Sequence, residues 1–461
     1  MHFAQIYTPG VAQCSYVIGS GEKCVVVDPI RSDINVYLEK AKEFGMEITG
    51  ILETHLHADF ISGHMELADV TGAKIYAPEI ANCTFPHHAL ADEEEFTIEN
   101  LRFKLLETPG HTPDCTIYVV TDLERGEEPV LAFTGDTLMV GDVGRPDLFP
   151  NREEELAEKL FNSLKRLKDL PDHVEVYPAH GMGSLCGKAL SAKLWSTIGT
   201  EKRNNYALRH TELEAFKEDL LADMPAAPDH FARCSEINRT GPELLRNLTQ
   251  PGAFSALEAD KAIRGGYSVI DFRAYHSFAG AHVPGSYSIS KYGNPATFAG
   301  WVVPPDDKLI LVLESGGNLE EVKTALYNVG LDNIHGYLEG SVESWLNAGL
   351  PTGSINTISV HELKERLERE KDLLLLDNRA KSEWESGHID EAILAPAPDM
   401  RQPAKDWNPE EEVVVHCNTS NRSMTAASLL EQKGFKKITN VLGGTTAWSA
   451  AGLPMKAEGE K

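Results

Sequence analysis

Short apolar runs alternate with turn residues along the first part of the chain, a pattern typical of short strands joined by tight turns. Apolar runs at 15–18 and 24–27 flank the turn residues 19–22 and predict two paired strands. Residues 34–44 place apolar side chains on one side at helical spacing, and a second helix is expected from His64. Further strands are expected at 48–52, 74–77, 129–133 and 174–177, with a hairpin over 96–106.

Polar residues that can bind a metal follow these predicted strands. In chain order they are His55, His57, Asp59, His111, Asp136 and His180. A sheet holds such strand-end groups rigidly, and imidazole together with carboxylate suits zinc, iron or manganese. The pattern therefore predicts a metal site at the ends of these strands.

The C-terminal part of the chain contains an internal repeat. The segment 267–285 recurs from residue 374, and in each copy an aspartate precedes a histidine by eleven residues. These pairs are Asp271 with His282 and Asp377 with His388. Strand, helix and strand alternate in both copies, which predicts two small α/β domains with parallel sheets.

The second copy places a cysteine at the end of an apolar strand. Residues 413–415 are followed by Cys417, a tight loop and a helix expected from Met424. Backbone N–H groups at a helix N-terminus form an anion-binding nest, and with Arg422 they would favour a thiolate or a persulfide on Cys417. The other loop residues expected around bound substrate are Asn418, Thr419, Ser420, Asn421 and Ser423.

The first copy lacks this chemistry. When the copies are aligned on a shared glycine, Leu313 stands opposite Cys417. Asn318 stands opposite Arg422. Both the nucleophile and the cation are missing, so we expect this copy to be catalytically silent and to serve in packing or assembly.

Composition and charge add limits to this picture. The chain has 461 residues, too many for one compact domain, and 42 % of them are hydrophobic, enough to bury several cores. Asp and Glu outnumber Lys and Arg by 70 to 43, and the net charge of −27 argues against nucleic acid or an anionic membrane as a partner. The seven scattered cysteines fit reduced thiols in a cytoplasm. Without a signal peptide or a membrane span in the sequence, we expect a cytoplasmic protein, and we expect it to be a homo-oligomer.

The strand-end motifs resemble those of the metallo-β-lactamase superfamily. THLHADF at 54–60, TPGHTP at 108–113, TGDTL at 134–138 and PAHG at 178–181 stand in that family's order. The resemblance covers about the first 230 residues and implies an αββα sandwich with metal between the edges of its two sheets. In the family's di-zinc hydrolases a histidine follows the aspartate of the first motif, and here that position is Phe60. The second metal site is therefore short of a ligand, which argues against a di-metal hydrolase.

The segment GDVGRPDL at 141–148 is similar to the GRxD segment of persulfide dioxygenases, a branch of this superfamily. This resemblance implies one Fe(II) per chain, with zinc as a possible substitute, held by His55, His111 and Asp136. Such a ligand set leaves open positions for persulfide and dioxygen. The groups that would orient ligands or waters around the metal are His57, Asp59 and His180.

Two further residues are candidates for the substrate site. Arg145 could hold an anionic substrate group, or could form a buried ion pair with Asp147 or Asp142. Cys186 could take or pass sulfur, with Lys188 favouring its thiolate, or could be an inert, partly buried cysteine.

The repeated C-terminal segments look like two rhodanese domains, because they carry a D-x-R…GH signature and a six-residue loop at 417–422. Ser420 stands where many rhodaneses have glycine. The whole chain thus resembles persulfide dioxygenase–sulfurtransferase fusions. The resemblance implies that dioxygen oxidises a low-molecular-weight thiol persulfide to sulfite. It also implies that sulfur on Cys417 passes to sulfite to give thiosulfate, or that this transfer runs in reverse.

We therefore expect an α/β and α+β multidomain protein, with a metallo-β-lactamase αββα sandwich followed by two rhodanese-like α/β domains with parallel sheets. The expected parts are a dioxygenase domain at 1–230, a linker at 231–252, an inactive copy at 253–353 and an active copy at 356–461. The main alternative is a zinc-dependent thioester or lactone hydrolase of the glyoxalase II type fused to a sulfurtransferase. Another is a sulfur carrier or scaffold whose metal site is vestigial.

Overall fold

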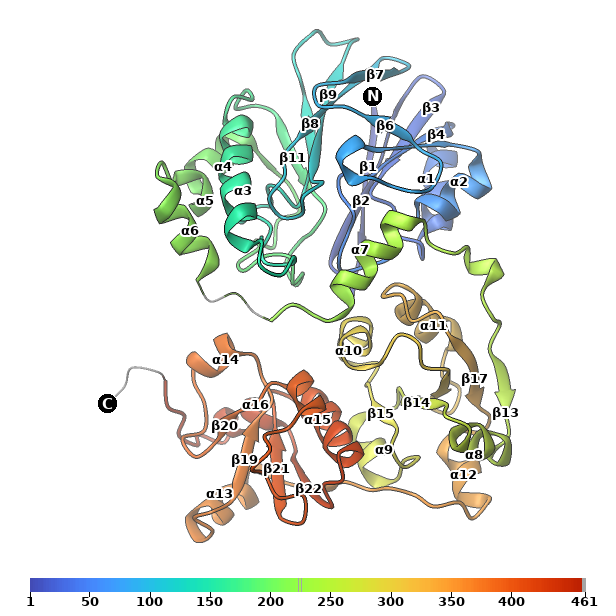
Figure 1. Cartoon of the computed structure of the whole chain (residues 1–461), viewed down its shortest axis with the longest axis vertical. Coiled ribbons are helices and arrows are strands. Elements are labelled where there is room, and N and C mark those ends of the chain that lie inside the picture. The colour runs from blue at the N-terminus through green and yellow to red at the C-terminus, as the bar shows by residue number, and fades with distance from the viewer. Residues whose placement is uncertain (223, 225, 458–461) are drawn as a thin grey trace. The chain divides into compact units, whose positions relative to one another are not determined.

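The computed structural model describes residues 1–222, 224 and 226–457 (Figure 1). The chain divides into two compact units, and residues 1–247 with 327–330 form the first of them. The second unit comprises 248–326 and the chain from 331 onward. None of the helices in the described ranges is long and apolar enough to cross a membrane.

The first unit contains two six-stranded sheets. The first sheet is formed, in spatial order, by β1 (His2–Thr8), β2 (Gln13–Ser20), β3 (Lys23–Val27), β4 (Glu47–Leu52), β5 (Lys74–Pro78) and β6 (His88–Leu90). The strands from β1 to β3 pair antiparallel, and those from β3 to β6 pair parallel. Parallel strands end at the same edge of a sheet, so the loop after β4 lies at that edge.

The second sheet has the spatial order β12-β11-β10-β9-β8-β7. Its strands are β7 (Glu95–Ile98), β8 (Leu101–Glu107), β9 (Thr116–Asp122), β10 (Leu131–Gly135), β11 (Glu175–Pro178) and β12 (Ser196–Thr197). The strands from β7 to β10 pair antiparallel, whereas β10 and β11 pair parallel.

The two sheets pack face to face, and helices cover their outer faces. Residues of both sheets, among them Tyr16, Phe103 and Phe133, share one apolar cluster. Helices α1 (Ile34–Phe44) and α2 (His64–Thr71) pack on the outer face of the first sheet. The second sheet is covered by α3 (Glu153–Lys168), α4 (Ile198–Asn204), α5 (Tyr206–Arg209) and α6 (Leu213–Leu221). This arrangement is the αββα sandwich that the resemblance to the metallo-β-lactamase superfamily implies.

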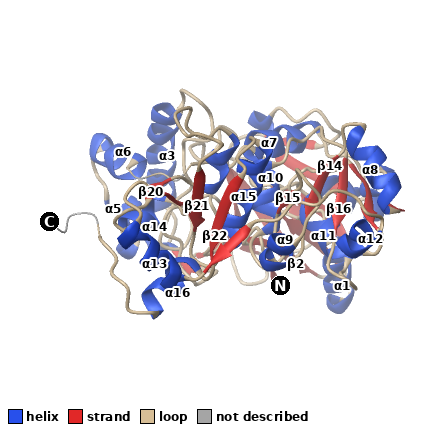
Figure 2. Ribbon diagram, turned by 90° about the horizontal axis from the view of Figure 1, so that it is seen from below, coloured by secondary structure: helices blue, strands red, loops and turns tan. Residues whose placement is uncertain are grey.

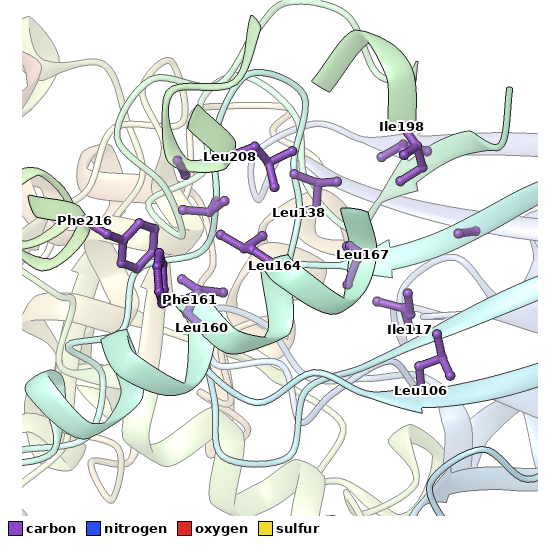
Figure 3. Packing of buried hydrophobic residues seen from close by; sticks show 14 of the residues in the cluster. Leu106, Ile117, Leu138, Leu160, Phe161, Leu164, Leu167, Ile198, Leu208 and Phe216 are labelled. Atoms are coloured by element: carbon purple, nitrogen blue, oxygen red, sulfur yellow. The ribbon is translucent and has the colours of Figure 1, made fainter. Parts of the chain in front are cut away.

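The helix α3 anchors the core on the second sheet. Leu156, Leu160, Leu164 and Leu167 recur at helical spacing and are buried. Its first turn is acidic and its last turn basic, which complements the helix dipole. Figure 3 shows side chains of α3 clustered with labelled residues of the strands and of α4 to α6, namely Leu106, Ile117, Ile198, Leu208 and Phe216.

The observed elements agree with the predicted ones over most of the first unit. The predicted helix at 34–44 has the bounds of α1, and the predicted strands at 15–18 and 24–27 lie within β2 and β3. The predicted elements do not include β1, β9 or α3.

The predicted linker at 231–252 contains a helix, α7 (His230–Thr240), that clusters with the first unit. Its buried face includes His230 and Asn238, which are polar, so the segment shows no clear apolar stripe. Short 3₁₀ helices, η1 (Glu79–Ala81) and η2 (Leu245–Asn247), complete this unit.

The second unit contains two five-stranded parallel sheets with the same topology. The strand orders are β13-β17-β16-β14-β15 and β18-β22-β21-β19-β20. The first sheet consists of β13 (Gly252–Phe254), β14 (Ser268–Asp271), β15 (Tyr287–Ser288), β16 (Leu309–Val312) and β17 (Ile334–Leu338). The second consists of β18 (Asn356–Ile358), β19 (Leu374–Asp377), β20 (Ile393–Leu394), β21 (Glu412–His416) and β22 (Lys437–Val441). The internal repeat in the sequence is thus a repeat in the fold.

Helices flank both sheets. Those of the first copy are α8 (Ala256–Arg264), α9 (Tyr275–Gly280), α10 (Pro295–Val302), α11 (Leu319–Tyr327) and α12 (Ser341–Asn347). Those of the second are α13 (Val360–Arg369), α14 (Lys381–Glu385), η3 (Ala397–Arg401), α15 (Asn421–Gln432) and α16 (Gly444–Ala450). In Figure 2, α13, α14 and α16 lie on one side of β21 and β22, and α15 lies on the other.

In both copies the D-x-R motif holds two segments of the backbone together. The Nε and Nη2 groups of Arg379 donate to Oδ1 and Oδ2 of Asp377, and Nη2 also donates to the carbonyl of Gly387. Arg273 binds Asp271 and the carbonyl of Ala281 in the same way. A buried bidentate pair of this kind ties the strand end to the loop that carries the histidine.

Helix α15 of the second copy packs against the first copy. The Thr425 hydroxyl donates to the carbonyl of Ser288 at 2.7 Å, and the Ser428 hydroxyl accepts from the Ser288 N–H at 3.1 Å. The ring of His282 lies 3.0 Å from the Glu431 carboxylate. The first copy therefore supports the helix that follows the Cys417 loop, as a packing role predicts.

Candidate active sites

The predicted metal ligands of the first unit come together at the strand ends. His55 follows β4, His111 follows β8, Asp136 follows β10 and His180 follows β11. All four side chains are buried. Four loops that are distant in sequence thus deliver imidazole and carboxylate groups to one place.

The atoms of His55, His111 and Asp136 can hold one metal ion. One nitrogen or oxygen atom from each lies within 4.8 Å of the others. The Nε2 atoms of His55 and His111 lie 3.8 and 3.4 Å from Asp136 Oδ2. Neither Nε2 atom has a hydrogen-bond partner in the structure. Buried nitrogen atoms without partners, facing a carboxylate, fit a metal ion.

Hydrogen bonds at the far side of each ring fix the tautomer. The Thr54 hydroxyl donates to Asp28, so it accepts from His55 Nδ1 at 3.0 Å. The carbonyl of Arg145 can only accept, so His111 Nδ1 donates to it at 2.8 Å. Both rings therefore direct an Nε2 lone pair at the metal position.

Burial and neighbouring groups together set the protonation states of His55, His111 and Asp136. Burial lowers the pKa of His55 and of His111, so both rings are neutral near pH 7 and able to bind a metal. Burial alone would raise the pKa of Asp136, but His180 and the two other histidines outweigh it and lower that pKa. Asp136 is therefore a carboxylate, as a metal ligand must be.

His57, Asp59 and His180 form a second buried group beside the first. His180 Nδ1 donates to both oxygens of Asp136 at 2.8 and 2.9 Å, and its Nε2 lies 2.8 Å from Asp59 Oδ2. Burial would lower the pKa of His180, but the two carboxylates raise it well above its ordinary value. The ring of His180 thus orients Asp136, as expected for an accessory residue.

Phe60 lies beside this second group. Its ring stacks on His57 with centroids 4.3 Å apart, and its centroid lies 6.1 Å from that of His180. Phe60 is fully buried. The ring of Phe60 cannot bind a metal, so a second metal ion beside His57 would have one protein ligand fewer.

Two groups of supporting residues could not be assigned from motifs. Asp28, at the end of β3, accepts hydrogen bonds from the N–H and the hydroxyl of Thr54 and lies 3.2 Å from His57 Nε2. The signal for Asp28 was present in the sequence, since it follows a predicted strand. Glu53 is also buried near His57, and burial raises its pKa well above its ordinary value.

The second supporting group belongs to α7. Asn238 accepts a hydrogen bond from the Ser62 N–H and donates to the carbonyls of His57 and Phe60, each at 2.8 Å. The Ser235 hydroxyl donates to the carbonyl of Leu56 at 3.1 Å. Helix α7 therefore holds the loop that carries His57 and Phe60, although α7 itself contains none of the metal-site motifs.

Arg145 forms a buried ion pair with Asp147, which was one of the two roles expected for it. Its guanidinium donates two hydrogen bonds of 2.6 Å to Asp147 and one of 3.3 Å to the carbonyl of Leu185. Its side chain is 1 % exposed. These bonds indicate a structural role for Arg145 rather than contact with substrate. The binding of an anionic substrate group by Arg145 stays a prediction.

Cys186 lies against the metal site, but its surroundings differ from those expected. It forms a potential ligand group with Asp136 and His180. It is fully buried, and burial together with Asp59 and Asp136 raises the pKa of its thiol. Lys188 directs its Nζ to the carbonyl of Asp219 at 2.6 Å. The expectation that Lys188 favours a thiolate on Cys186 is therefore wrong, because buried carboxylates dominate there.

In the second unit, Cys417 follows β21 and precedes α15. Its side chain is buried, and the Ser423 hydroxyl lies 3.5 Å from its sulfur. The carbonyl of Cys417 accepts a hydrogen bond from the Thr445 N–H at 2.8 Å. A Cβ atom on Gly444 would lie 1.9 Å from that carbonyl oxygen, so only glycine fits there.

The remaining loop residues take different positions. Ser420 has φ of 77°, a left-handed conformation that favours glycine. Its hydroxyl donates to the carbonyl of Val441 at 3.1 Å and accepts from the Gly443 N–H at 2.8 Å, which compensates for that conformation. Thr419 is exposed, and Asn421 begins α15. Their contact with substrate, like that of Asn418 and Ser423, stays a prediction.

Arg422 is paired with Glu383, a residue that motif analysis did not identify. The guanidinium donates hydrogen bonds of 2.5 and 2.7 Å to the two carboxylate oxygens of Glu383. The Asn418 side-chain amide donates to the same carboxylate at 2.7 Å. Glu383 lies 39 residues before Arg422, so no local pattern links them.

Comparisons with known proteins agree with this division of the chain. The metallo-beta-lactamase superfamily matches residues 8–180. The rhodanese-like domain matches twice, at 255–348 and 359–451. The second unit therefore holds two rhodanese-like domains.

Individual relatives carry different names. The chain is 32 % identical over 238 residues to a hydroxyacylglutathione hydrolase of Chromohalobacter salexigens, which corresponds to 52 % of this chain and 83 % of the relative. It is 27 % identical over 180 residues to the mitochondrial persulfide dioxygenase ETHE1 of Bos taurus, which corresponds to 38 % of this chain and 66 % of the relative. The chain spans 60 to 62 % of the length of several other curated relatives.

A solved structure covers more of the chain. The crystal structure of a metallo-beta-lactamase from Staphylococcus aureus is 32 % identical, with a TM-score of 0.65, and the match covers 73 % of this chain and 98 % of that one. With the strand-end ligands, the αββα sandwich and the two parallel-sheet repeats, these matches establish that the chain belongs to the metallo-β-lactamase superfamily and carries two rhodanese-like domains after its metallo-β-lactamase domain.

Proposed function

We propose that this protein oxidises a low-molecular-weight thiol persulfide with dioxygen at a single Fe(II) site and transfers sulfur through Cys417. The observation that carries the proposal is the burial of Phe60 against His57, beside the ligand group of His55, His111 and Asp136. Because Phe60 cannot bind a metal, the second group has one ligand fewer, which favours a mononuclear metal. The relative named as a persulfide dioxygenase and the rhodanese-like domains support sulfur chemistry.

In this proposal His55, His111 and Asp136 hold the iron. Iron with open positions would bind both the persulfide sulfur and dioxygen and support their reaction. The residues of the chain contribute orientation and charge. His180 holds the Asp136 carboxylate, the carbonyl of Arg145 holds His111, and the buried surroundings exclude bulk water.

The overall reaction balances with one water. A persulfide RSSH, dioxygen and water give the thiol RSH and sulfite with release of protons, so the terminal sulfur is oxidised and dioxygen is reduced. Arg145 and Cys186 are the candidates for contact with the persulfide, and which thiol carries it is left open.

The second reaction is sulfur transfer without net oxidation. A persulfide on Cys417 gives its terminal sulfur to sulfite, the S–S bond to Cys417 breaks, and thiosulfate and the Cys417 thiol are formed. The N-terminus of α15 stabilises negative charge on the transferred sulfur. The candidates for binding the anion around Cys417 are Arg422, Asn418, Thr419, Ser420, Asn421 and Ser423. We further propose a cytoplasmic homo-oligomer, with partners limited to these small molecules.

A hydrolase of the glyoxalase II type is the second candidate. Two observations favour it: relatives with that activity in their names, and the second ligand group of His57, Asp59 and His180. It requires a metal-activated water and predicts thioester cleavage without oxygen uptake.

Two variants test whether the reactions are separable. Cys417→Ser replaces the thiolate with an alcohol that is protonated at neutral pH. Oxygen uptake with a persulfide should survive, while the product shifts from thiosulfate to sulfite. Asp136→Ala should abolish oxygen uptake and keep sulfur transfer from thiosulfate to a thiol. The products are measured by chromatography, with Cys83→Ser as the cysteine control, and loss of oxygen uptake in Cys417→Ser would contradict the order of reactions proposed here.

A further inference from the structure

The Cys417 sulfur lies at the end of a buried row of three polar side chains. The Ser423 hydroxyl lies 3.5 Å from the sulfur and donates to Asn440 Oδ1 at 2.6 Å. Ser423 and Asn440 are fully buried, and Cys417 is 1 % exposed. Bulk water does not reach such groups, so they depend on one another for hydrogen bonds.

The direction of these hydrogen bonds suits a neutral thiol. A hydroxyl has one hydrogen to donate and two lone pairs that accept. Ser423 gives its hydrogen to Asn440 Oδ1, which is nearer than the carbonyl of Ser420 at 3.3 Å. The Ser423 oxygen can then accept a hydrogen bond from the S–H group of Cys417. Sulfur transfer requires the thiolate, which has no hydrogen and needs a donor in place of an acceptor.

The side-chain amide of Asn440 can reverse this direction. Its Nδ2 group is buried and has no hydrogen-bond partner among the described residues. A half-turn of the amide exchanges Nδ2 with Oδ1, which have nearly the same size and shape. Nδ2 then donates to the Ser423 oxygen, and the Ser423 hydroxyl is free to donate to the sulfur. The turn replaces one hydrogen bond with another and loses none, because Nδ2 has none to lose.

The silent copy has a different side chain at the position of Asn440. In the second copy β22 pairs Asn440 with the residue two places before Cys417. In the first copy β17 pairs Tyr337 with the residue two places before Leu313. A tyrosine hydroxyl lies several bonds farther from the backbone than an asparagine amide, so Tyr337 cannot take the same place.

The position of Ser423 has also changed in the silent copy. Leu319 follows Leu313 by six residues, which is the separation of Ser423 from Cys417. Both copies nevertheless have the same strand order, so the fold does not require the hydroxyl or the amide. The nucleophile, the hydroxyl and the amide are present together in one copy and absent together from the other. This links Ser423 and Asn440 to the chemistry of Cys417.

We propose that Asn440 is a positioning residue for sulfur transfer, which directs the Ser423 hydroxyl to the Cys417 sulfur when that sulfur is a thiolate. This inference rests on the proposed sulfur transfer at Cys417 and adds a residue that no motif identified. No proton passes between the three residues. The proton of the thiol leaves to water, and the hydroxyl and the amide change only their orientation.

The test follows alkylation of Cys417 against pH in the full-length protein. Iodoacetamide reacts with the thiolate, and mass spectrometry of the Cys417 peptide gives the midpoint pH, at which the rate is half of its plateau. Ser423→Ala removes the hydroxyl and should raise this midpoint by about one pH unit, a tenfold loss of thiolate below it. The first copy already carries an apolar side chain at this position, so the fold should tolerate the change.

Asn440→Leu tests the amide itself. In this variant nothing directs the hydroxyl hydrogen, which divides between the sulfur and the carbonyl of Ser420, so the midpoint should rise by about half a pH unit. In the double variant with Ser423→Ala, the midpoint should equal that of Ser423→Ala alone, because Asn440 acts through Ser423. The same variants should slow sulfur transfer from thiosulfate to a thiol at pH values below the midpoint.

Thr439→Val is the matched control. Thr439 is buried on the same strand, but its side chain points to the opposite face from Asn440 and its hydroxyl donates to Glu412 at 2.7 Å. The midpoint should equal that of the wild type in this variant, and it should stay close to that value in Ser423→Thr, which keeps a hydroxyl. The charged and titratable groups around the sulfur are the same in every variant: Arg422 with Glu383, Arg379 with Asp377, and His416.

Three results would overturn the proposal. They are an unchanged midpoint in Asn440→Leu, an equal rise in Thr439→Val, and a double variant whose rise is the sum of the two single ones. If the midpoints behave as expected but the wild type transfers no sulfur, the proposed sulfur transfer fails, whereas the hydrogen bonds that Asn440 directs to the thiolate are supported.

Discussion

Asn238 gives the sharpest test of how the metal loop is held. Its side chain is fully buried and makes three hydrogen bonds of 2.8 Å to the loop that carries His57 and Phe60. Asn238→Ala removes all three and leaves an N–H and two carbonyls of the loop without these partners. The loop should then sample conformations in which its ligands no longer converge.

The size of the effect follows from these bonds. A buried hydrogen bond contributes about 1 kcal/mol net, so three should contribute about 3 kcal/mol to the stability of the first unit. For a unit of this size, about 2–4 °C of Tm corresponds to each kcal/mol, which predicts a fall of about 6–12 °C. Loss of an outer support typically weakens metal binding by about 10–100-fold.

The assay is competition for Fe(II) between the protein and a chelator under anaerobic conditions, together with calorimetry. Ser235→Ala is the control, since it removes a single bond of 3.1 Å from the same helix to the same loop. It should cost about 1 kcal/mol and leave metal affinity within a few-fold of the wild type. An unchanged metal affinity and Tm in Asn238→Ala would refute the view that α7 secures the site.

Three further predictions follow from single positions. Asp136→Ala should lose its bound metal, seen by elemental analysis, because Asp136 is the carboxylate of the ligand group that it forms with His55 and His111. Gly444→Ala should abolish sulfur transfer, seen with thiosulfate and a thiol, because its Cβ would lie 1.9 Å from the Cys417 carbonyl oxygen; Gly452→Ala, with open space around it, should stay active. Burial lowers the pKa of His416 to about 4, so the unfolded chain binds a proton below about pH 6.5 that the folded one does not. The C-terminal domain should therefore lose roughly 3 kcal/mol as pH falls from 6.5 to 4, and denaturant unfolding of His416→Gln should show a weaker pH dependence.

The candidate metal-binding residues could be predicted because they follow apolar runs, and a strand end fixes the direction of the next few side chains. The resemblance to persulfide dioxygenases then singled out His55, His111 and Asp136 as the proposed ligands. The two α/β domains were predictable from the internal repeat, whereas the αββα sandwich was expected because the strand-end motifs resemble those of the metallo-β-lactamase superfamily.

Other features depend on contacts that leave no local trace. Asn238 meets its loop across 176 to 181 residues of sequence, and its helix buries polar groups in place of an apolar stripe. No local pattern marks Glu383 as a partner of Arg422, because only the fold brings the two side chains together. For Cys186 the local sequence was misleading. Lys188, two residues away, suggested a thiolate, whereas the fold places the carboxylates of Asp59 and Asp136 near the sulfur. Helix α3 carried a clear leucine spacing and could have been predicted.

We propose that the first unit is a mononuclear iron dioxygenase for persulfides. The most direct measurement is oxygen uptake by protein purified anaerobically and loaded with iron, given a thiol persulfide, with metal content determined on the same sample. We expect about one iron per chain, oxygen consumption that follows iron occupancy, and sulfite as the product when sulfur transfer is blocked. Two tightly bound zinc ions per chain, with thioester cleavage and no oxygen uptake, would contradict it.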